Sequence, residues 1–469
     1  SRSMVYTMPE FLERRYNPQS RTILSVISLV SYVLTKVAVT VYAGGLVFQQ
    51  VFGIKELWGI DFFWIAAIGL VVLTALYTIF GGMKSVLYTS VLQTPILLLG
   101  SLIILVLGFK ELGGWDEMMR VCGAVTVNDY GDTMTNLIRS NDDANFPWLG
   151  ALIGSAIIGF WYWCTDQFIV QRVLSGKNEK EARRGTIFGA YLKLLPVFLF
   201  LIPGMIAFAL HQKYIGAGGE GFLPMLANGT ANADAAFPTL VAKLLPAGVK
   251  GLVVCGILAA LMSSLASLFN SSAMLFTIDF YKRFRPETPE KKLVGIGQIA
   301  TVVIVILGIL WIPIMRSVGD VLYTYLQDVQ SVLAPGIAAA FLLGICWKRT
   351  SAQGGMWGLI SGMVIGLTRL GAKVYYSNAG EVADSTFKYL FYDMNWLFFC
   401  GWMFLFCIIV VIVVSLATEA PTAEKIQGLV FGTATKEQKA ATRASWNHWD
   451  IIHTVIILAI TAAFYWYFW

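Results

Sequence analysis

Eleven apolar stretches, each long enough to cross a bilayer, constrain this chain more than any other feature. In lipid every backbone N–H and C=O must be paired within the protein, so such stretches fold as α-helices. Hydrophobic residues make up 57% of the 469 positions and charged residues 13%, which is typical of a polytopic membrane protein. The predicted spans are 22–51, 62–80, 86–108, 149–170, 185–210, 240–280, 293–314, 321–345, 354–370, 396–416 and 451–469.

The charges of the loops predict the orientation. Clusters of Lys and Arg fall in alternate loops, whereas the loops between them are poor in cations and often acidic. By the positive-inside rule, the first residue lies in the cytoplasm and the last lies outside, as an odd number of spans requires. The predicted location is the plasma membrane, in the style of a bacterial inner membrane. The net charge of +6 is spread over short loops and does not indicate nucleic-acid binding.

Several kinds of chemistry are disfavoured by the residues present. Five of the six cysteines lie in apolar spans, so no disulfide framework is expected. The three histidines are far apart, and no hydrolase, metalloprotease or phosphate-binding motif occurs. An intramembrane enzyme is the weakest functional class, because no nucleophile–base pair stands out.

The fourth span contains the run WYWCTDQ, residues 161–167. An ionised carboxylate at bilayer depth costs roughly 2.5–3.5 kcal/mol, so Asp166 should face a polar interior or the membrane edge. Gly154 and Gly159, just upstream, are positions where the helix could loosen. The run is either part of a solute path or the polar end of an ordinary buried span.

Other polar residues fall inside the predicted spans. Lys36 and Lys193 must each snorkel, find a partner or line water; a role in a solute path is favoured over a structural ion pair. Tyr323 and Gln327 share one helix face. The amide of Gln327 suits a hydroxyl-rich neutral ligand, although an interhelical hydrogen bond would also explain it.

A third pattern lies in the sixth span. Ala260, Ser263, Ser264 and Ser267 share one helix face, at spacings of three and four residues. Small residues at this spacing usually allow close helix packing. The alternative is a cation site, in which two hydroxyls and a carbonyl supply part of the oxygen shell and an unwound segment supplies the rest.

Together these stretches resemble the solute:sodium symporter family, and within it the sodium/glucose cotransporter branch. The matching runs are spread over most of the chain. They are TMPEFLERRYN, ALYTIFGGMKSVLYTSVLQT, WYWCTDQFIVQRVLSGKN, AYLKLLPVFLFLIPGM, LMSSLASLFNSSAMLFTIDFY and the runs at 325–336 and 341–349.

The resemblance implies an all-α polytopic membrane protein with a LeuT-like fold of two inverted five-helix repeats. The family's first repeat opens with a broken helix and a further ligand-bearing helix, neither of which is present, so an N-terminally truncated symporter is expected. The implied organisation is a cytoplasmic loop (1–21), the last three helices of the first repeat (22–110), an extracellular loop (111–148), the second repeat (149–347), and peripheral C-terminal helices (348–469) with a cytoplasmic linker at 417–446.

The resemblance also implies a sugar site. Tyr162 corresponds to the aromatic residue on which the sugar rests, and Trp163 to its neighbour in the pocket. Lys193 and Gln327 correspond to residues that hydrogen-bond sugar hydroxyls. Tyr323 corresponds to the position of an aromatic residue in the family's outer gate. Lys36 corresponds to a pocket position that varies within the family.

For Na⁺, the resemblance implies that the carbonyl of Ala260 and the hydroxyls of Ser263 and Ser264 form half of a site. Members that bind a second Na⁺ have an acid at the position of Ser90 and further hydroxyls near Ser267. Here Ser90 replaces the acid and Ala266 occupies one of the hydroxyl positions, so one Na⁺ per sugar is expected.

The predicted function is therefore Na⁺-coupled symport of a glucose- or galactose-like monosaccharide into the cell. The expected partners are the sugar, sodium ion and the lipid bilayer, without nucleic acid. Two alternatives remain. One is a symporter of another small solute, such as inositol, sialic acid or an amino acid; the other is a sugar sensor that does not concentrate its ligand.

Overall fold

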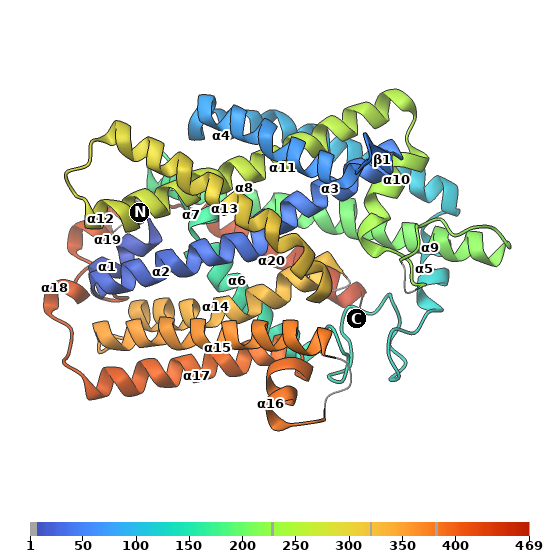
Figure 1. The fold of residues 1–469 in the computed structure, drawn as a ribbon. Coiled ribbons are helices and arrows are strands. Elements are labelled where there is room, and N and C mark those ends of the chain that lie inside the picture. The colour runs from blue at the N-terminus through green and yellow to red at the C-terminus, as the bar shows by residue number, and fades with distance from the viewer. Residues whose placement is uncertain (1–6, 227–228, 319–320, 380–382, 469) are drawn as a thin grey trace. The chain divides into compact units, whose positions relative to one another are not determined.

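A computed structural model describes residues 7–226, 229–318, 321–379 and 383–468, except for the side chains of 77, 79–90, 92 and 316–318. The chain forms two compact units. The first unit comprises Ser1–Lys36, Asn141–Phe188 and Ser271–Ile456, and the second comprises Val37–Ser140, Gly189–Asn270 and Ile457–Trp469. Both units are built almost entirely from helices (Figure 1).

The first unit contains most of the helices. Its elements are α1 (Met8–Arg15), α2 (Pro18–Ser31), α6 (Trp148–Phe160), η2 (Trp161–Thr165), α7 (Gln167–Leu174), η5 (Leu275–Tyr281), α12 (Lys282–Phe284), α13 (Glu290–Val318), α14 (Leu322–Cys346), α15 (Ala352–Asn378), α16 (Thr386–Lys388), η6 (Tyr389–Asp393), α17 (Trp396–Ala417), α18 (Ala423–Ile426) and α19 (Lys436–Ala444).

The second unit adds one short hairpin to its helices. Its elements are α3 (Ala38–Phe52), β1 (Glu56–Leu57), β2 (Ile60–Asp61), α4 (Phe62–Leu112), α5 (Trp115–Gly123), η3 (Val197–Leu201), α9 (Ile202–Gly216), η4 (Ala233–Ala235) and α10 (Ala236–Leu244). Four helical elements pass from one unit to the other: η1 (Tyr32–Val37), α8 (Glu179–Pro196), α11 (Ala247–Met274) and α20 (His448–Tyr467).

Among the described residues, nine helical segments are long and apolar enough to cross a membrane. The predicted spans 62–80 and 86–108 form one continuous helix, α4. The short segment between them contains no proline, so nothing in it forces the helix to end. The predicted span 354–370 lies within α15, which is not among the nine and carries Arg369 and Lys373 four residues apart.

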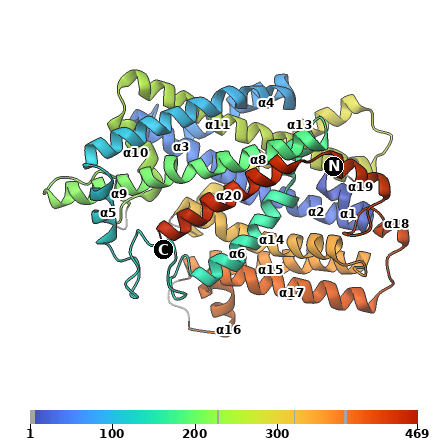
Figure 2. The same ribbon diagram turned by 180° about the vertical axis from the view of Figure 1, so that it is seen from behind.

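The first unit has a core in which helix backbones approach closely. Helices α14, α15 and α17 lie side by side (Figures 1 and 2). A Cβ atom added to Gly362 on α15 would lie 2.6 Å from the Cα of Gly336 on α14. Likewise, a Cβ on Gly154 of α6 would lie 2.9 Å from the carbonyl oxygen of Leu397 on α17. These glycines therefore let helices pack at backbone contact distance.

The second unit has its own hydrophobic core, in which α4 packs against α9 and α10. Ile104 of α4 is fully buried there, as are Ile206 and Leu210 of α9 and Leu240 of α10. Gly108 allows the approach of α9, since a Cβ at this position would lie 3.0 Å from the side chain of Ile206.

Several helices contain a π-helical turn, in which hydrogen bonds span five residues instead of four. One such bond runs from the N–H of Asp166 to the carbonyl of Trp161 over 3.0 Å, at the end of η2. The sequence suggested that this helix loosens at Gly154 or Gly159. That placement was wrong, because Gly154 is used for packing against α17 and the irregular turn begins at Trp161.

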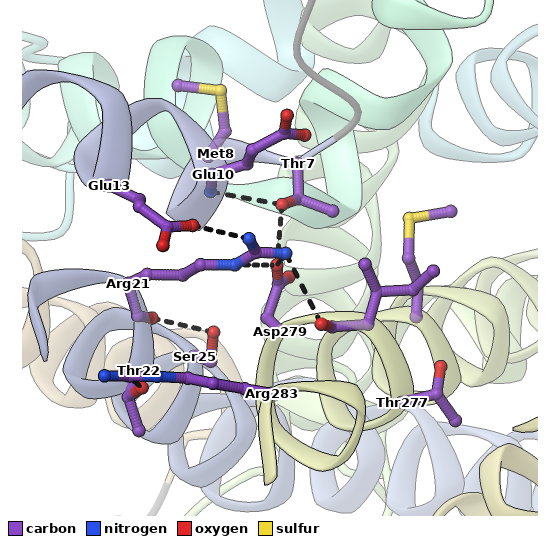
Figure 3. A network of polar contacts seen from close by, with 12 residues as sticks. Thr7, Met8, Glu10, Glu13, Arg21, Thr22, Ser25, Thr277, Asp279 and Arg283 are labelled. Atoms are coloured by element: carbon purple, nitrogen blue, oxygen red, sulfur yellow. Dashed lines mark hydrogen bonds and ion pairs between the residues drawn. The ribbon is translucent and has the colours of Figure 1, made fainter. Parts of the chain in front are cut away.

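A polar network joins the N-terminal part of the first unit to η5 (Figure 3). Asp279 of η5 is fully buried; its Oδ1 accepts a hydrogen bond from Thr7 Oγ1 (3.0 Å) and another from Arg21 Nε (2.7 Å). Arg21 also donates to Glu13 over 2.6 Å. Next to this network, Arg283 Nη1 donates to the carbonyl of Pro18 over 2.5 Å. The start of α2 is thereby fixed to the end of η5.

The close approach of α14 and α15 predicts the effect of a single methyl group. In Gly366→Ala the new Cβ would collide with the carbonyl oxygen of Val332 on α14. Overpacking typically costs about 1–3 kcal/mol, which exceeds the ~1 kcal/mol that alanine gains over glycine in a helix. We expect a lower apparent Tm for the variant in thermal unfolding of the purified protein in detergent.

Gly371→Ala is the matched control on the same helix. A Cβ at this position meets no atom within 4 Å, so its Tm should stay the same or rise. Equal Tm values for the two variants would contradict the close packing of α14 on α15.

Candidate functional site

The helix that carries the WYWCTDQ run breaks at Asp166. This residue follows the π-helical turn η2 and has extended backbone angles, with φ −75° and ψ 119°. Its carboxylate then caps the next helix, α7, because Oδ1 accepts a hydrogen bond from the N–H of Phe168 over 3.2 Å. The acid is therefore both the point of interruption and the N-cap that restarts the helix.

Asp166 forms a buried ion pair with Lys36, which lies in the π-helical turn η1. The side chain of Lys36 is 10% exposed and that of Asp166 is 2% exposed. The hydroxyl of Tyr32, one turn before Lys36, donates to Asp166 Oδ1 over 3.2 Å. That same hydroxyl accepts a hydrogen bond from the N–H of Phe168 over 3.1 Å. The pair therefore ties η1 to the break between η2 and α7.

Four aromatic rings surround the ammonium group of Lys36. The distances from Nζ to the ring centroids are 4.3 Å for Phe168, 4.6 Å for Tyr32, 5.6 Å for Tyr162 and 6.0 Å for Trp161. A cation over an aromatic face is attracted by the ring quadrupole, more strongly where water is excluded. Lys36 was predicted as a pocket residue; it does lie against Tyr162, but protein groups already satisfy its charge.

Tyr162 and Trp163 lie together in η2. Their rings form a T-shaped pair with centroids 5.2 Å apart. Tyr162 is half-buried and packs against the core that includes Ala334 and Ile337 of α14, whereas Trp163 is 51% exposed. The structure thus brings three predicted site residues, Lys36, Tyr162 and Trp163, into one cluster with a partly accessible aromatic surface.

The other predicted sugar ligands of the first unit lie on α14. Tyr323 is exposed and Gln327 is half-buried, one turn further along the helix. Tyr325 fixes this part of α14 to η1, because its hydroxyl donates to the carbonyl of Leu34 over 2.9 Å. Trp311 Nε1 in turn donates to the Tyr325 hydroxyl over 2.6 Å. The helix carrying Gln327 is thereby joined to the turn carrying Lys36.

Sequence reasoning missed a second charged cluster, beside Gln327. Asp328 forms an ion pair with Lys373 of α15, and its Oδ1 lies 3.8 Å from Arg369 Nη2. Arg369 is fully buried, donates to the carbonyls of Leu390 and Met394, and lies 4.0 Å from the ring centroid of Phe399. The spacing of Arg369 and Lys373 on one helix face was the available signal.

The remaining predicted residues belong to the second unit. Lys193 is exposed on α8 and precedes Pro196, after which the π-helical turn η3 begins. On α11, Ala260 is half-buried, Ser263 is buried and Ser264 is exposed, so this face has one accessible hydroxyl. Ala266 is buried, and the side chain of Ser90 lies outside the described part of the chain.

Known proteins resemble the chain over most of its length. The family model described as "Sodium:solute symporter family" matches residues 1–362. A sodium/mannose cotransporter of Bos taurus is 35% identical over 99% of this chain and 81% of its own length. Sodium/glucose cotransporter 1 of Ovis aries is 37% identical over 88% of this chain, and sodium/myo-inositol cotransporter 2 of Homo sapiens is 35% identical over 92%. The chain spans 64% of the length of each of these two relatives.

One solved structure resembles the fold. Its title describes the "substrate-bound outward-open state of a Na+-coupled sialic acid symporter". The TM-score is 0.66 at 21% sequence identity, over 89% of this chain and 78% of that protein. The similarity confirms the predicted helical transporter architecture of the LeuT-like type.

The buried pair predicts a non-additive pattern of stability. Lys36→Met leaves the carboxylate of Asp166 buried without its cation, which typically costs about 3–5 kcal/mol. Adding Asp166→Asn removes the uncompensated charge and retains an oxygen that can cap α7. The double variant should therefore recover most of the free energy of unfolding, measured by denaturant titration in mixed micelles.

Lys388→Ala provides the control. Lys388 pairs with Asp384, whose side chain is 93% exposed, and exposed pairs contribute about 0–1 kcal/mol. Two results would contradict the buried pair. One is a double variant whose loss of unfolding free energy equals the sum of the losses for Lys36→Met and Asp166→Asn. The other is a loss for Lys36→Met no larger than that for Lys388→Ala.

Proposed function

Since the chain belongs to the sodium:solute symporter family, we propose that it uses the inward movement of Na⁺ to accumulate a monosaccharide or a related polyol. The family predicted from the sequence is confirmed, and its members are transporters and not enzymes. The observation that carries the proposal is the partly exposed Tyr162–Trp163 pair, held at a helix break beside a charge-compensated lysine.

A pyranose suits this surface. Sugars have apolar ring faces and a polar rim, so they bind where an aromatic ring is flanked by a few hydrogen-bonding groups. We assign the stacking surface to Tyr162, with Trp163 beside it. The polar contacts are assigned to the amide of Gln327 and the amine of Lys193, and the outer gate to Tyr323.

Lys36 has a different proposed role from these ligands. Its ammonium pairs with Asp166 and lies 5.6 Å from the ring centroid of Tyr162. A lysine held in this way orients the stacking surface without needing to contact the sugar. We therefore propose that Lys36 is a positioning residue, through which the ion pair determines where Tyr162 lies.

For sodium, we propose a site that includes the carbonyl of Ala260 and the hydroxyls of Ser263 and Ser264. Hydroxyl and carbonyl oxygens are suitable ligands for a hard cation. Binding of the ion and of the sugar to one shared conformation would raise the affinity for each in the presence of the other. We keep the predicted ratio of one Na⁺ per sugar on the basis of Ser90 and Ala266.

The substrate class follows from the relatives. Their names include mannose, myo-inositol and glucose cotransporters, and the fold is shared with a sialic acid symporter. We propose a hexose, with a polyol such as inositol as the second candidate. The chain is a multi-pass membrane protein, and we propose that its first residue faces the cytoplasm and that it lies in a bacterial inner membrane.

Uphill uptake in proteoliposomes tests the proposed function. With an inward Na⁺ gradient, labelled hexose should accumulate above its outside concentration, and a competition panel of mannose, glucose, myo-inositol and sialic acid should identify the substrate. Tyr162→Ala should raise KM about 3- to 10-fold, since an aromatic stack contributes about 0.5–1.5 kcal/mol. Tyr162→Phe should retain the wild-type KM.

Trp402→Ala is the control for that series, because Trp402 is 63% exposed on α17. If the inside concentration of labelled hexose only reaches the outside concentration, the proposal is wrong. The protein would then bind its ligand without concentrating it. Accumulation of sialic acid or of an amino acid instead of a hexose would overturn the substrate class alone.

The coupling ratio is a separate prediction. One Na⁺ crossing 100 mV supplies about 2.3 kcal/mol, and a tenfold Na⁺ gradient adds roughly 1.4 kcal/mol. Together these sustain a sugar gradient of about several hundredfold. With one Na⁺ per sugar, a tenfold change in the sugar gradient should shift the reversal potential by about 59 mV, whereas about 30 mV would indicate two.

A further inference from the structure

A groove of about 430 Å³ opens on the first unit between α2, η5 and α13. Its walls are apolar and aromatic. They include Leu29 of α2, Phe276 and Tyr281 of η5, and Ile296, Ile299 and Val303 of α13. Ile299 and Val303 are 67% and 50% exposed, so the groove is open toward the surroundings of the first unit. In a membrane, the medium at such a surface is lipid.

One end of the groove is polar and fixed by contacts. Tyr281, which lines the groove, leads directly into α12, and Arg283 of α12 donates to the carbonyl of Pro18 at the start of α2. On α13, Lys292 precedes Ile296 by four residues and Ile299 by seven, which places it on the helix face that lines the groove. The ends of all three walls therefore meet at one basic loop.

The charge of that loop is strongly positive. Residues 282–292 contain five cations and two carboxylates, which gives a net charge of +3. All five cations are exposed, and Arg283 also donates to the carbonyl of Pro18; the other four are Lys282, Arg285, Lys291 and Lys292. The N-terminal end of the long helix α13 adds a partial positive charge at the same place.

The apolar part of the groove matches one leaflet of a bilayer. The lining residues of α13 run from Ile296 to Ile304, which corresponds to about 12 Å along the helix axis. Half of a hydrocarbon core of ≈ 30 Å is about 15 Å. An acyl chain entering from a headgroup at the basic loop would thus lie along the groove for most of its leaflet.

We propose that this groove binds an anionic phospholipid, with one acyl chain along α13 and the phosphate against Lys292 and its neighbouring cations. Moving an acyl chain from bulk lipid into the groove changes its free energy little, because lipid tails are as apolar as leucine. Selectivity must therefore come from the headgroup. Basic sites next to membrane helices select anionic headgroups in this way. The inference goes beyond the proposed transport function and does not depend on the identity of the solute.

Native mass spectrometry of the purified chain in detergent tests the proposal, with dioleoyl phosphatidylglycerol and dioleoyl phosphatidylcholine as probes. We expect phosphatidylglycerol to be retained in preference to phosphatidylcholine, and excess glycerol 3-phosphate not to displace it. Lys292→Gln should weaken phosphatidylglycerol binding about fivefold, since each cation near the surface contributes ≈ 1 kcal/mol. Val303→Trp should lower the retention of phosphatidylglycerol, because the indole fills the groove in which the acyl chain lies.

Two substitutions outside the proposed site serve as matched controls. Lys348→Gln removes an equal charge from the exposed turn between α14 and α15, and Val302→Trp adds an equal bulk at a side chain that is 56% exposed but is not a groove residue. Both should retain at least half of the wild-type affinity. The proposal would be overturned if the wild-type protein retained the two lipids equally. It would also be overturned if the groove variants and the control variants lost the same affinity for phosphatidylglycerol. Because the readout is lipid retention, failure here leaves the uptake experiments unaffected.

Discussion

The ion pair between Lys36 and Asp166 is the interaction on which the candidate site depends. Neither charge would be stable alone at this depth, because burying a carboxylate or an ammonium without a partner costs several kcal/mol. Together they occupy a cage made by Tyr32, Tyr162 and Phe168. The pair therefore requires η1, η2 and the start of α7 to remain together, and the position of the Tyr162 ring follows from that requirement.

Four of the residues expected to form the site lie in irregular helix turns or next to one. Lys36 lies in η1, Tyr162 and Trp163 lie in η2, and Lys193 lies one turn before η3. A π-helical turn changes the pairing of backbone carbonyls and turns side chains away from the regular helical positions. In a membrane this irregularity is tolerated only where protein or water covers the backbone. Such turns therefore lie where polar side chains can be both buried and accessible to a solute.

The sequence predicted the helical class and the positions of the unusual polar residues, because membrane burial leaves a strong local pattern of hydropathy. The family was predicted from the resemblance of particular runs such as WYWCTDQ. The sequence did not predict which charges pair. Lys36 was assigned to the pocket, yet its partner Asp166 is 130 positions away, and no local pattern encodes that distance. The pairing of Asp328 with Arg369 and Lys373 on another helix was missed for the same reason, although the spacing of the two cations on α15 was a local signal. The role of Gly154 could not be predicted either, since only the contact with Leu397 shows that it serves packing.

Three buried acids of the first unit show how charge can define a conformational state. Asp166 is paired with Lys36, Asp279 with Arg21 and Asp328 with Lys373, and each pair joins two different helical elements. Removing one partner from a buried pair typically costs about 3–5 kcal/mol, so these helices cannot separate while the acids remain dry and charged. A transport cycle can move such elements only if it admits water to the pair, exchanges its partner or carries both helices together. While the acids stay dry, charged and paired as they are here, the pairs thus define groups of helices that must move as units.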